Sequence, residues 1–218
     1  MELKNKKIAF LGDSITQGCS ASKPENFYWN SVATETGAIG YGYGIGGTRI
    51  APQRIPSEDP VYDQYFISRV DEMIPDADIV VVFGGTNDFG HGDAPFGTWN
   101  DRGENTFCGA VHTLLQKLIA RYPHAQLVMM TPLHREDEER LDCGDQGKPR
   151  QARLEAYVDA IIRISGYYGV PVLDLFRVSG MQPAIPLLKE LFNPDGLHPN
   201  DAGHRKIADR LIGFLRTL

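Results

Sequence analysis

The chain has 218 residues, of which 42% are hydrophobic and 23% are charged, and its formal net charge at pH 7 is -6. A chain of this size buries about 70% of its unfolded surface, so we expect a single domain over residues 1–218 with a full core. The acidic balance excludes the basic surface of nucleic-acid-binding proteins. No apolar run is long enough for a membrane span or a signal peptide, so we expect a cytoplasmic protein.

Four short segments are almost purely apolar, at residues 8–11, 79–83, 127–130 and 170–173. Continuous rather than alternating apolar runs are typical of strands that are buried on both faces, as in a parallel sheet. A fifth, weaker strand is predicted at residues 38–43, which are rich in glycine and tyrosine.

Helical periodicity fills the intervals between these runs. Apolar residues recur at helical spacing over residues 62–73, 107–122, 154–162 and 207–215, and more loosely over 27–36. Strands that alternate with helices imply right-handed crossovers and helices on both faces of one sheet. The predicted fold class is therefore α/β, a three-layer α/β/α arrangement around a doubly wound parallel sheet of about five strands. Ligands bind such sheets at the carboxyl ends of the strands.

The first polar motif, GDSITQG at residues 12–18, lies where the first strand must turn. Gly12 permits a tight turn, and Ser14 then lies at the end of the strand, beside the free N–H groups of a following helix. A serine in that place can act as a nucleophile, and its own N–H can face an oxyanion. The alternative is that Asp13 and Ser14 only cap a helix.

Two glycine-containing motifs follow the second and third strands. In YGIGGTR, residues 43–49, the glycines let a backbone N–H approach a ligand closely, although a flexible turn fits equally well. In GGTND, residues 84–88, Asn87 offers a neutral donor to a developing oxyanion, or takes part in an ordinary Asx turn.

The last motif, DGLHPN at residues 195–200, precedes the final predicted helix. Asp195 and His198 are three residues apart, so a turn or helix places both side chains on one face. The carboxylate can then orient the imidazole while the other ring nitrogen deprotonates a serine. A capping turn with a solvent-facing histidine is the alternative. All four motifs follow predicted strands, so one edge of the sheet gathers the groups that acyl transfer requires.

In this order the motifs resemble those of the SGNH hydrolases, also called the GDSL esterase/lipase family. Residues 12–18 are similar to the first block of the family and residues 85–88 to the third. Gly47, or its neighbour Gly46, matches the lone glycine of the second block, and the pair Asp195 and His198 matches the last.

The resemblance implies a flavodoxin-like fold with no metal ion and no organic cofactor. It implies that Ser14 is the nucleophile, that His198 is the general base and that Asp195 orients this base. It also implies an oxyanion hole that consists of the Ser14 N–H, the Gly47 N–H and the Asn87 side chain.

The predicted function is that of a serine esterase or acylhydrolase that cleaves small carboxylic esters through a covalent acyl-enzyme. Carbohydrate O-acetyl esterase, thioesterase and lysophospholipase activities stay open for the same site. A metal-dependent phosphatase would need carboxylates clustered around Mg²⁺, and a non-catalytic binding module could use the same scaffold. The full set of reactive groups argues against both. The sequence does not predict an oligomeric state.

Other parts of the chain allow weaker predictions. The charged segment at residues 134–148 is either a solvated loop or a lid over the substrate pocket.

The three cysteines are far apart and none forms a C-x-x-C pair, which argues against disulfides and a zinc site; they are Cys19, Cys108 and Cys143. Aromatic residues near the motifs could line the pocket or pack in the core; they are Phe89, His91, Phe96, Trp99 and His134.

Overall fold

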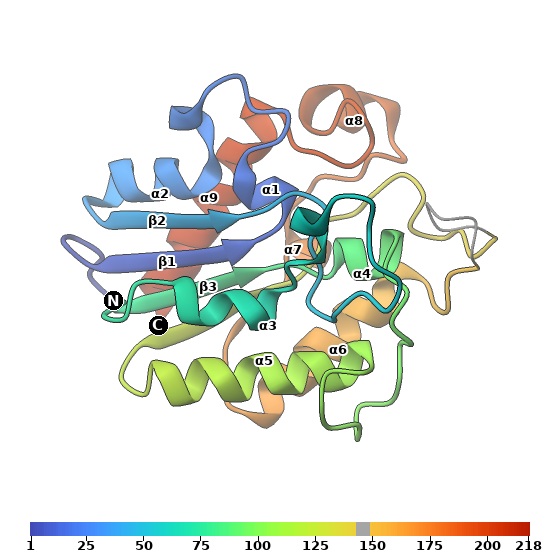
Figure 1. Cartoon of the computed structure of the whole chain (residues 1–218). Helices are drawn as coiled ribbons and strands as arrows, with labels where there is room; N and C mark the ends of the chain where they lie inside the picture. The colour runs from blue at the N-terminus through green and yellow to red at the C-terminus, as the bar shows by residue number, and fades with distance from the viewer. Residues whose placement is uncertain (143–148) are drawn as a thin grey trace.

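The computed structural model describes residues 1–142 and 149–218 and contains a five-stranded parallel sheet, in the order β2-β1-β3-β4-β5. The central strand β3 pairs with β1 on one side and β4 on the other (Figure 1), so the chain winds outward in both directions. The strands are β1 (Lys7–Gly12), β2 (Ile39–Gly44), β3 (Ile79–Phe83), β4 (Gln126–Met130) and β5 (Val172–Leu173). The predicted α/β fold with about five strands is confirmed.

Helices follow the strands and cover both faces of the sheet (Figure 1). The longer helices in the described ranges are α2 (Tyr28–Thr36), α5 (Phe107–Arg121), α6 (Leu154–Tyr167), α8 (Pro186–Phe192) and α9 (Asp201–Thr217). The short ones are α1 (Ser14–Gln17), α3 (Phe66–Arg69), α4 (Thr86–Gly90) and α7 (Leu175–Val178). Turns of 3-10 helix occur at Pro24–Asn26, Pro60–Asp63 and Val70–Glu72.

The strands bury side chains on both faces, as their continuous apolar sequences predict. Along β1, Phe10 packs into the core beneath α2 and α9, whereas Leu11 packs into the core beneath α3, α5 and α6. The same alternation occurs along β3, where Val81 faces the first core and Val82 the second. The first three polar motifs begin at the carboxyl ends of β1, β2 and β3, whereas the last motif, predicted to follow a strand, follows α8 instead.

Two predicted elements differ from the structure. The periodic residues 62–73 form three short turns rather than one helix, because Tyr65 is extended and the Phe66 N–H donates to the Arg49 carbonyl, 2.8 Å away. The last strand is shorter than its apolar run, because Pro171 has no N–H to donate to the sheet. Its carbonyl still accepts a hydrogen bond from the Met129 N–H.

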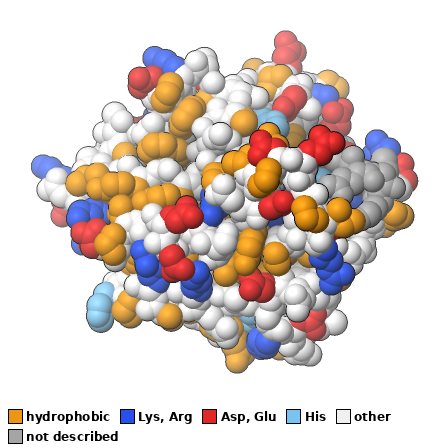
Figure 2. Space-filling model, in the orientation of Figure 1, with side chains coloured by type: hydrophobic (Ala, Val, Ile, Leu, Met, Phe, Trp, Pro, Cys, Tyr) orange, Lys and Arg blue, Asp and Glu red, His pale blue; other side chains and the backbone are white. Residues whose placement is uncertain are grey.

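The surface carries charges of both signs. On the face shown in Figure 2, acidic and basic side chains are interspersed with apolar ones. Over residues 1–142 and 149–218, no helix has the length and apolar content needed to cross a bilayer.

Candidate active site

Ser14 lies in the tight turn that joins β1 to α1. A Cβ on Gly12 would lie 2.0 Å from Thr16 Oγ1, so only glycine fits this turn. The Asp13 carboxylate accepts a hydrogen bond from the Ile15 N–H at 3.0 Å and caps α1. The capping interpretation of the motif is therefore correct for Asp13, while the Ser14 side chain is left for other contacts.

Ser14, His198 and Asp195 form a hydrogen-bonded row. Ser14 Oγ lies 3.0 Å from His198 Nε2, and His198 Nδ1 lies 2.7 Å from Asp195 Oδ2. The other oxygen of Asp195 accepts the N–H groups of Leu197 and His198 at 2.8 and 2.7 Å. The structure thus brings together three side chains from opposite ends of the sequence.

The contacts of Asp195 favour its ionised form. Partial burial alone would raise the pKa of this carboxyl group, but the hydrogen bonds from the Leu197 N–H and from the backbone and ring of His198 outweigh burial and hold the pKa below its usual value. An ionised carboxylate fixes the proton of the imidazole on Nδ1 and leaves Nε2 to accept the proton of Ser14.

The two candidate glycines differ in their hydrogen bonds. The Gly46 N–H donates to Gln17 Oε1 at 2.7 Å, so it is engaged within the protein. Gly47 has a φ of 73°, and a Cβ there would lie 3.1 Å from the Tyr62 ring. This difference favours Gly47 as the donor to a ligand, which leaves Gln17 with a supporting role that the sequence did not indicate.

Asn87 lies at the start of α4, where it is buried with 5% exposure. One of its amide N–H groups donates to the Thr48 carbonyl at 3.0 Å. A side-chain amide has two such donors, so the bond to Thr48 fixes the plane of the group while the second N–H can serve a ligand.

These groups line one cavity of about 500 Å³, which we call the rim cavity. This volume is within the range of small-molecule sites. Its lining residues are Ser14, Gln17, Cys19, Ile45, Gly46, Gly47, Val61, Tyr62, Asn87, His91, Arg135, Leu197 and His198.

Asp88 fixes the loop after β2 relative to α4. Both of its carboxylate oxygens accept backbone N–H groups, from Ala51 at 2.9 Å and from Ile50 at 3.0 Å. Burial raises the pKa of this carboxyl group to about 6. The residue next to Asn87 therefore holds the glycine motif in place, a role that the sequence motif did not distinguish from a turn.

Arg69 holds the ends of β1 and β2 together. Its guanidinium donates to the carbonyls of Gly12 and Tyr43 at 3.0 and 2.7 Å, and to Thr48 Oγ1 at 2.9 Å. Sequence reasoning missed this residue, because a lone arginine inside an apolar stripe carries no local signal of long-range contacts.

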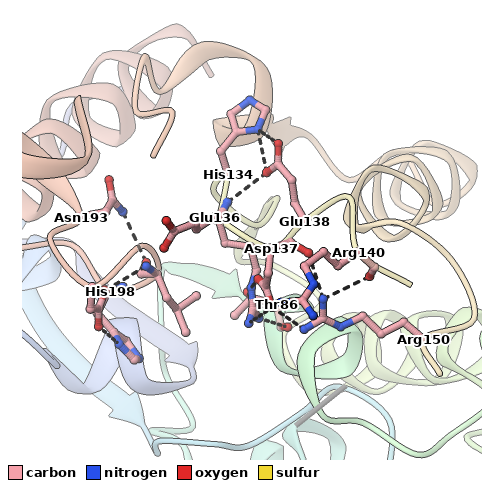
Figure 3. A network of polar contacts seen from close by, with 12 residues as sticks. Thr86, His134, Glu136, Asp137, Glu138, Arg140, Arg150, Asn193 and His198 are labelled. Carbon is pink, nitrogen blue, oxygen red and sulfur yellow. Dashed lines mark hydrogen bonds and ion pairs between the residues drawn. The ribbon is translucent and has the colours of Figure 1, made fainter. Parts of the chain in front are cut away.

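Arg135, in the charged segment after β4, and Arg150 form an arginine pair that shares the carboxylate of Asp137; Asp137 and Arg150 are seen in Figure 3. Arg135 donates to Asp137 from Nε at 2.5 Å and from Nη2 at 3.2 Å, and Arg150 also pairs with Asp137. Arg135 Nη1 reaches the Thr86 carbonyl at 3.2 Å, beside Asn87. Residues 143–148 of the predicted lid lie outside the described residues, and the lid role stays a prediction.

Of the five aromatic candidates, only His91 lines the rim cavity, and its Nδ1 lies 2.9 Å from Arg49 Nη1. Phe89 is buried beneath the arginine pair, and Trp99 packs on Arg163. The other two are half-buried: Phe96 stacks on Phe107, and the His134 ring packs against Phe176 at a tilt.

Two of the three cysteines lie in the described part of the chain. Cys19 is half-buried at the rim cavity and Cys108 is buried, while Cys143 lies outside the described residues. Burial raises the pKa of both described thiols, which keeps them protonated at neutral pH. In the part of the chain that is described, no cluster of three or more His, Cys, Asp or Glu residues could hold a metal ion.

Solved structures with similar folds cover this chain almost completely. A protein of Lactobacillus plantarum is 32% identical, with a TM-score of 0.83 over 99% of this chain and 98% of its own. A candidate GDSL-like lipase of Bacteroides ovatus is 20% identical, with a TM-score of 0.72 over the whole of both chains. A two-domain esterase active on acetylated mannans is 23% identical, with a TM-score of 0.66 over 97% of this chain and 49% of its own. The last two identities show a shared fold.

A search of curated proteins finds no match. The model of the GDSL-like Lipase/Acylhydrolase family, however, matches residues 10–206, which contain every motif described above. The chain therefore belongs to the GDSL-like lipase/acylhydrolase family and is a hydrolase of that family.

Proposed function

We propose that this protein hydrolyses carboxylic esters through a covalent acyl-enzyme on Ser14. The observation that carries the proposal is the hydrogen-bonded row in which Ser14 Oγ lies 3.0 Å from His198 Nε2 and His198 Nδ1 lies 2.7 Å from Asp195. These distances suit transfer of the serine proton to the imidazole without rearrangement.

His198 takes the proton of Ser14 as Oγ attacks the ester carbonyl. The protonated imidazole, stabilised by Asp195, then gives this proton to the departing alcohol, and the acyl group stays on Ser14. A water molecule repeats the sequence and releases the acid. The oxyanion of each tetrahedral intermediate accepts hydrogen bonds from the N–H groups of Ser14 and Gly47 and from the Asn87 amide.

The test is the Ser14→Ala variant. With p-nitrophenyl acetate as substrate, loss of the nucleophile should lower kcat on the order of 10⁶-fold, by analogy with another triad enzyme. A fluorophosphonate probe should label the wild type at Ser14 and leave the variant unlabelled. Ser31→Ala, on α2 and outside the rim cavity, is the control and should keep wild-type activity. Wild-type activity of Ser14→Ala would refute the proposal.

A carbohydrate O-acetyl esterase is a second candidate, because the fold neighbour that is active on acetylated mannans shares this scaffold over one of its halves. A panel of esters with graded acyl chains, acetylated sugars and a thioester separates the activities. Acetylated sugars should be the best substrates if this candidate is correct.

A further inference from the structure

The rim cavity contains an unbalanced positive charge. Its lining includes Arg135 but no aspartate or glutamate, although the whole chain has a net charge of -6. Among the residues that line the cavity, the permanently charged side chain is therefore that of Arg135, and it is cationic.

The guanidinium of Arg135 is fixed in place. Only 6% of the residue is exposed, and its guanidinium carbon lies 5.3 Å from the centre of the Phe89 ring. Gly90 leaves room for it, since a Cβ there would lie 2.6 Å from Nη1. A charged group with this support loses little freedom when it binds a ligand.

The surrounding carboxylate does not cancel this charge. Asp137 accepts from both Arg135 and Arg150, so two cations share one anion and these three side chains together keep one positive charge. Arg150 rests on Phe89 as well, at 4.2 Å from the ring centre. A partly buried excess charge is costly until a counter-ion arrives.

Arg135 also keeps a donor for a ligand. A guanidinium has five N–H groups, and its acceptors among the described residues are the two oxygens of Asp137 and the two oxygens of Thr86. At least one N–H thus remains, on a residue that lines the cavity together with Ser14.

We propose that Arg135 binds a carboxylate of the substrate, so that the preferred esters carry one negative charge on their acid half or their alcohol half. This inference rests on the proposed function of Ser14 and names the substrate class of that site. One excess positive charge in the cluster matches one carboxylate better than a dianionic phosphate.

The experiment compares matched esters that differ in one charge. One pair is p-nitrophenyl hemiglutarate and its methyl ester, in which the carboxylate is on the acid half. The other pair is 4-acetoxybenzoate and its methyl ester, in which it is on the alcohol half. We measure the ratio of kcat/KM within each pair, after correction for the uncatalysed hydrolysis of each ester.

The wild type should favour the charged ester at least about 10-fold in one pair. Arg135→Met should lower that ratio about 10- to 100-fold, the usual effect of losing a hydrogen bond to a charged group. Arg135→Lys should retain part of the preference. Arg153→Met is the control, because Arg153 is exposed and paired with Glu139. The kcat/KM ratio of Arg153→Met should equal that of the wild type.

Two results would overturn the proposal: a wild-type ratio of one or less in both pairs, or an unchanged ratio in Arg135→Met. The first needs no variant, so it decides even where Arg135→Met does not fold. A binding measurement separates this proposal from the proposed function. Ser14→Ala should bind monomethyl glutarate more tightly than dimethyl glutarate whether or not the wild type cleaves esters, and equal affinities would refute the anion site alone.

Discussion

Asn87 is the residue whose proposed contribution to catalysis can be measured most cleanly. Its amide is held by the Thr48 carbonyl and lines the same cavity as Ser14. Asn87→Ala removes one of the three proposed oxyanion donors, so kcat should fall about 10²- to 10³-fold and a measurable remnant should persist. Initial rates with p-nitrophenyl acetate give the comparison.

Asn105→Ala is the matched control for this prediction, because Asn105 is exposed and outside the rim cavity. It should keep wild-type rates. A fall in kcat of less than about threefold in Asn87→Ala would show that this amide does not face the oxyanion.

At the scale of single residues, the sequence indicated the reactive groups better than their supports. Ser14 and Asn87 stand in short motifs directly after β1 and β3, His198 stands in a motif between α8 and α9, and all three line the rim cavity. Gln17 was not identified, because its role depends on the position of the Gly46 N–H across the turn. A side chain that acts on a distant backbone group leaves no pattern around itself.

At the scale of elements, α9 is positioned by its N-cap residue, Asn200. The Asn200 side chain accepts a hydrogen bond from the Gly203 N–H at 3.1 Å and donates to the Leu191 carbonyl at 3.0 Å. It therefore caps α9 two residues after His198 and ties this helix to α8. The next residue, Asp201, accepts hydrogen bonds from the backbone N–H and the hydroxyl of Ser22.

Loss of this cap should destabilise the protein without removing any reactive group. Asn200→Ala should lower the free energy of unfolding by about 0.5–2 kcal/mol, equivalent to a fall in Tm of roughly 2–4 °C per kcal/mol for a chain of this length. Thermal or urea unfolding measures it. Asn200→Asp keeps the cap and loses only the bond to Leu191. A larger loss of unfolding free energy in Asn200→Asp than in Asn200→Ala would contradict this account.

Element boundaries were predictable where periodicity alone decides them. The stripe over residues 107–122 became α5 almost unchanged, and Pro123 follows its end. The stripe over 62–73 broke into turns, because the Phe66 N–H and the Arg69 side chain bond to segments that the local pattern cannot see. Tertiary hydrogen bonds thus override a weak local preference.

At the scale of the whole molecule, parallel topology is what assembles the site. Ser14 and His198 are 184 positions apart in the sequence, yet their side chains are within hydrogen-bonding distance. Consecutive buried strands that alternate with helices were enough to predict one shared edge for all four motifs. The position of Arg135 was not predictable, because it depends on a long side chain that crosses from the charged segment to Thr86.

The stability of the whole fold should depend on pH through Asp13. This carboxyl group is fully buried at the N-terminus of α1, and burial raises its pKa to about 6 from an ordinary value of 3.8. The folded state thus keeps a proton that the unfolded chain loses near pH 4. The stabilising effect is complete below about pH 4 and is lost as pH rises through about 6.

Asp13→Asn should remove this dependence, because an amide keeps the acceptor for the Ile15 N–H and never ionises. The free energy of unfolding of the variant, relative to wild type, should therefore increase by about 2–3 kcal/mol between pH 4 and pH 7, as measured by urea denaturation.

Asp88→Asn is the variant with which Asp13→Asn is compared. Burial also raises the pKa of Asp88 to about 6, but both oxygens accept backbone N–H groups, so its amide loses one acceptor at every pH. A flat or falling difference for Asp13→Asn would mean that Asp13 is already ionised in the folded protein at pH 4.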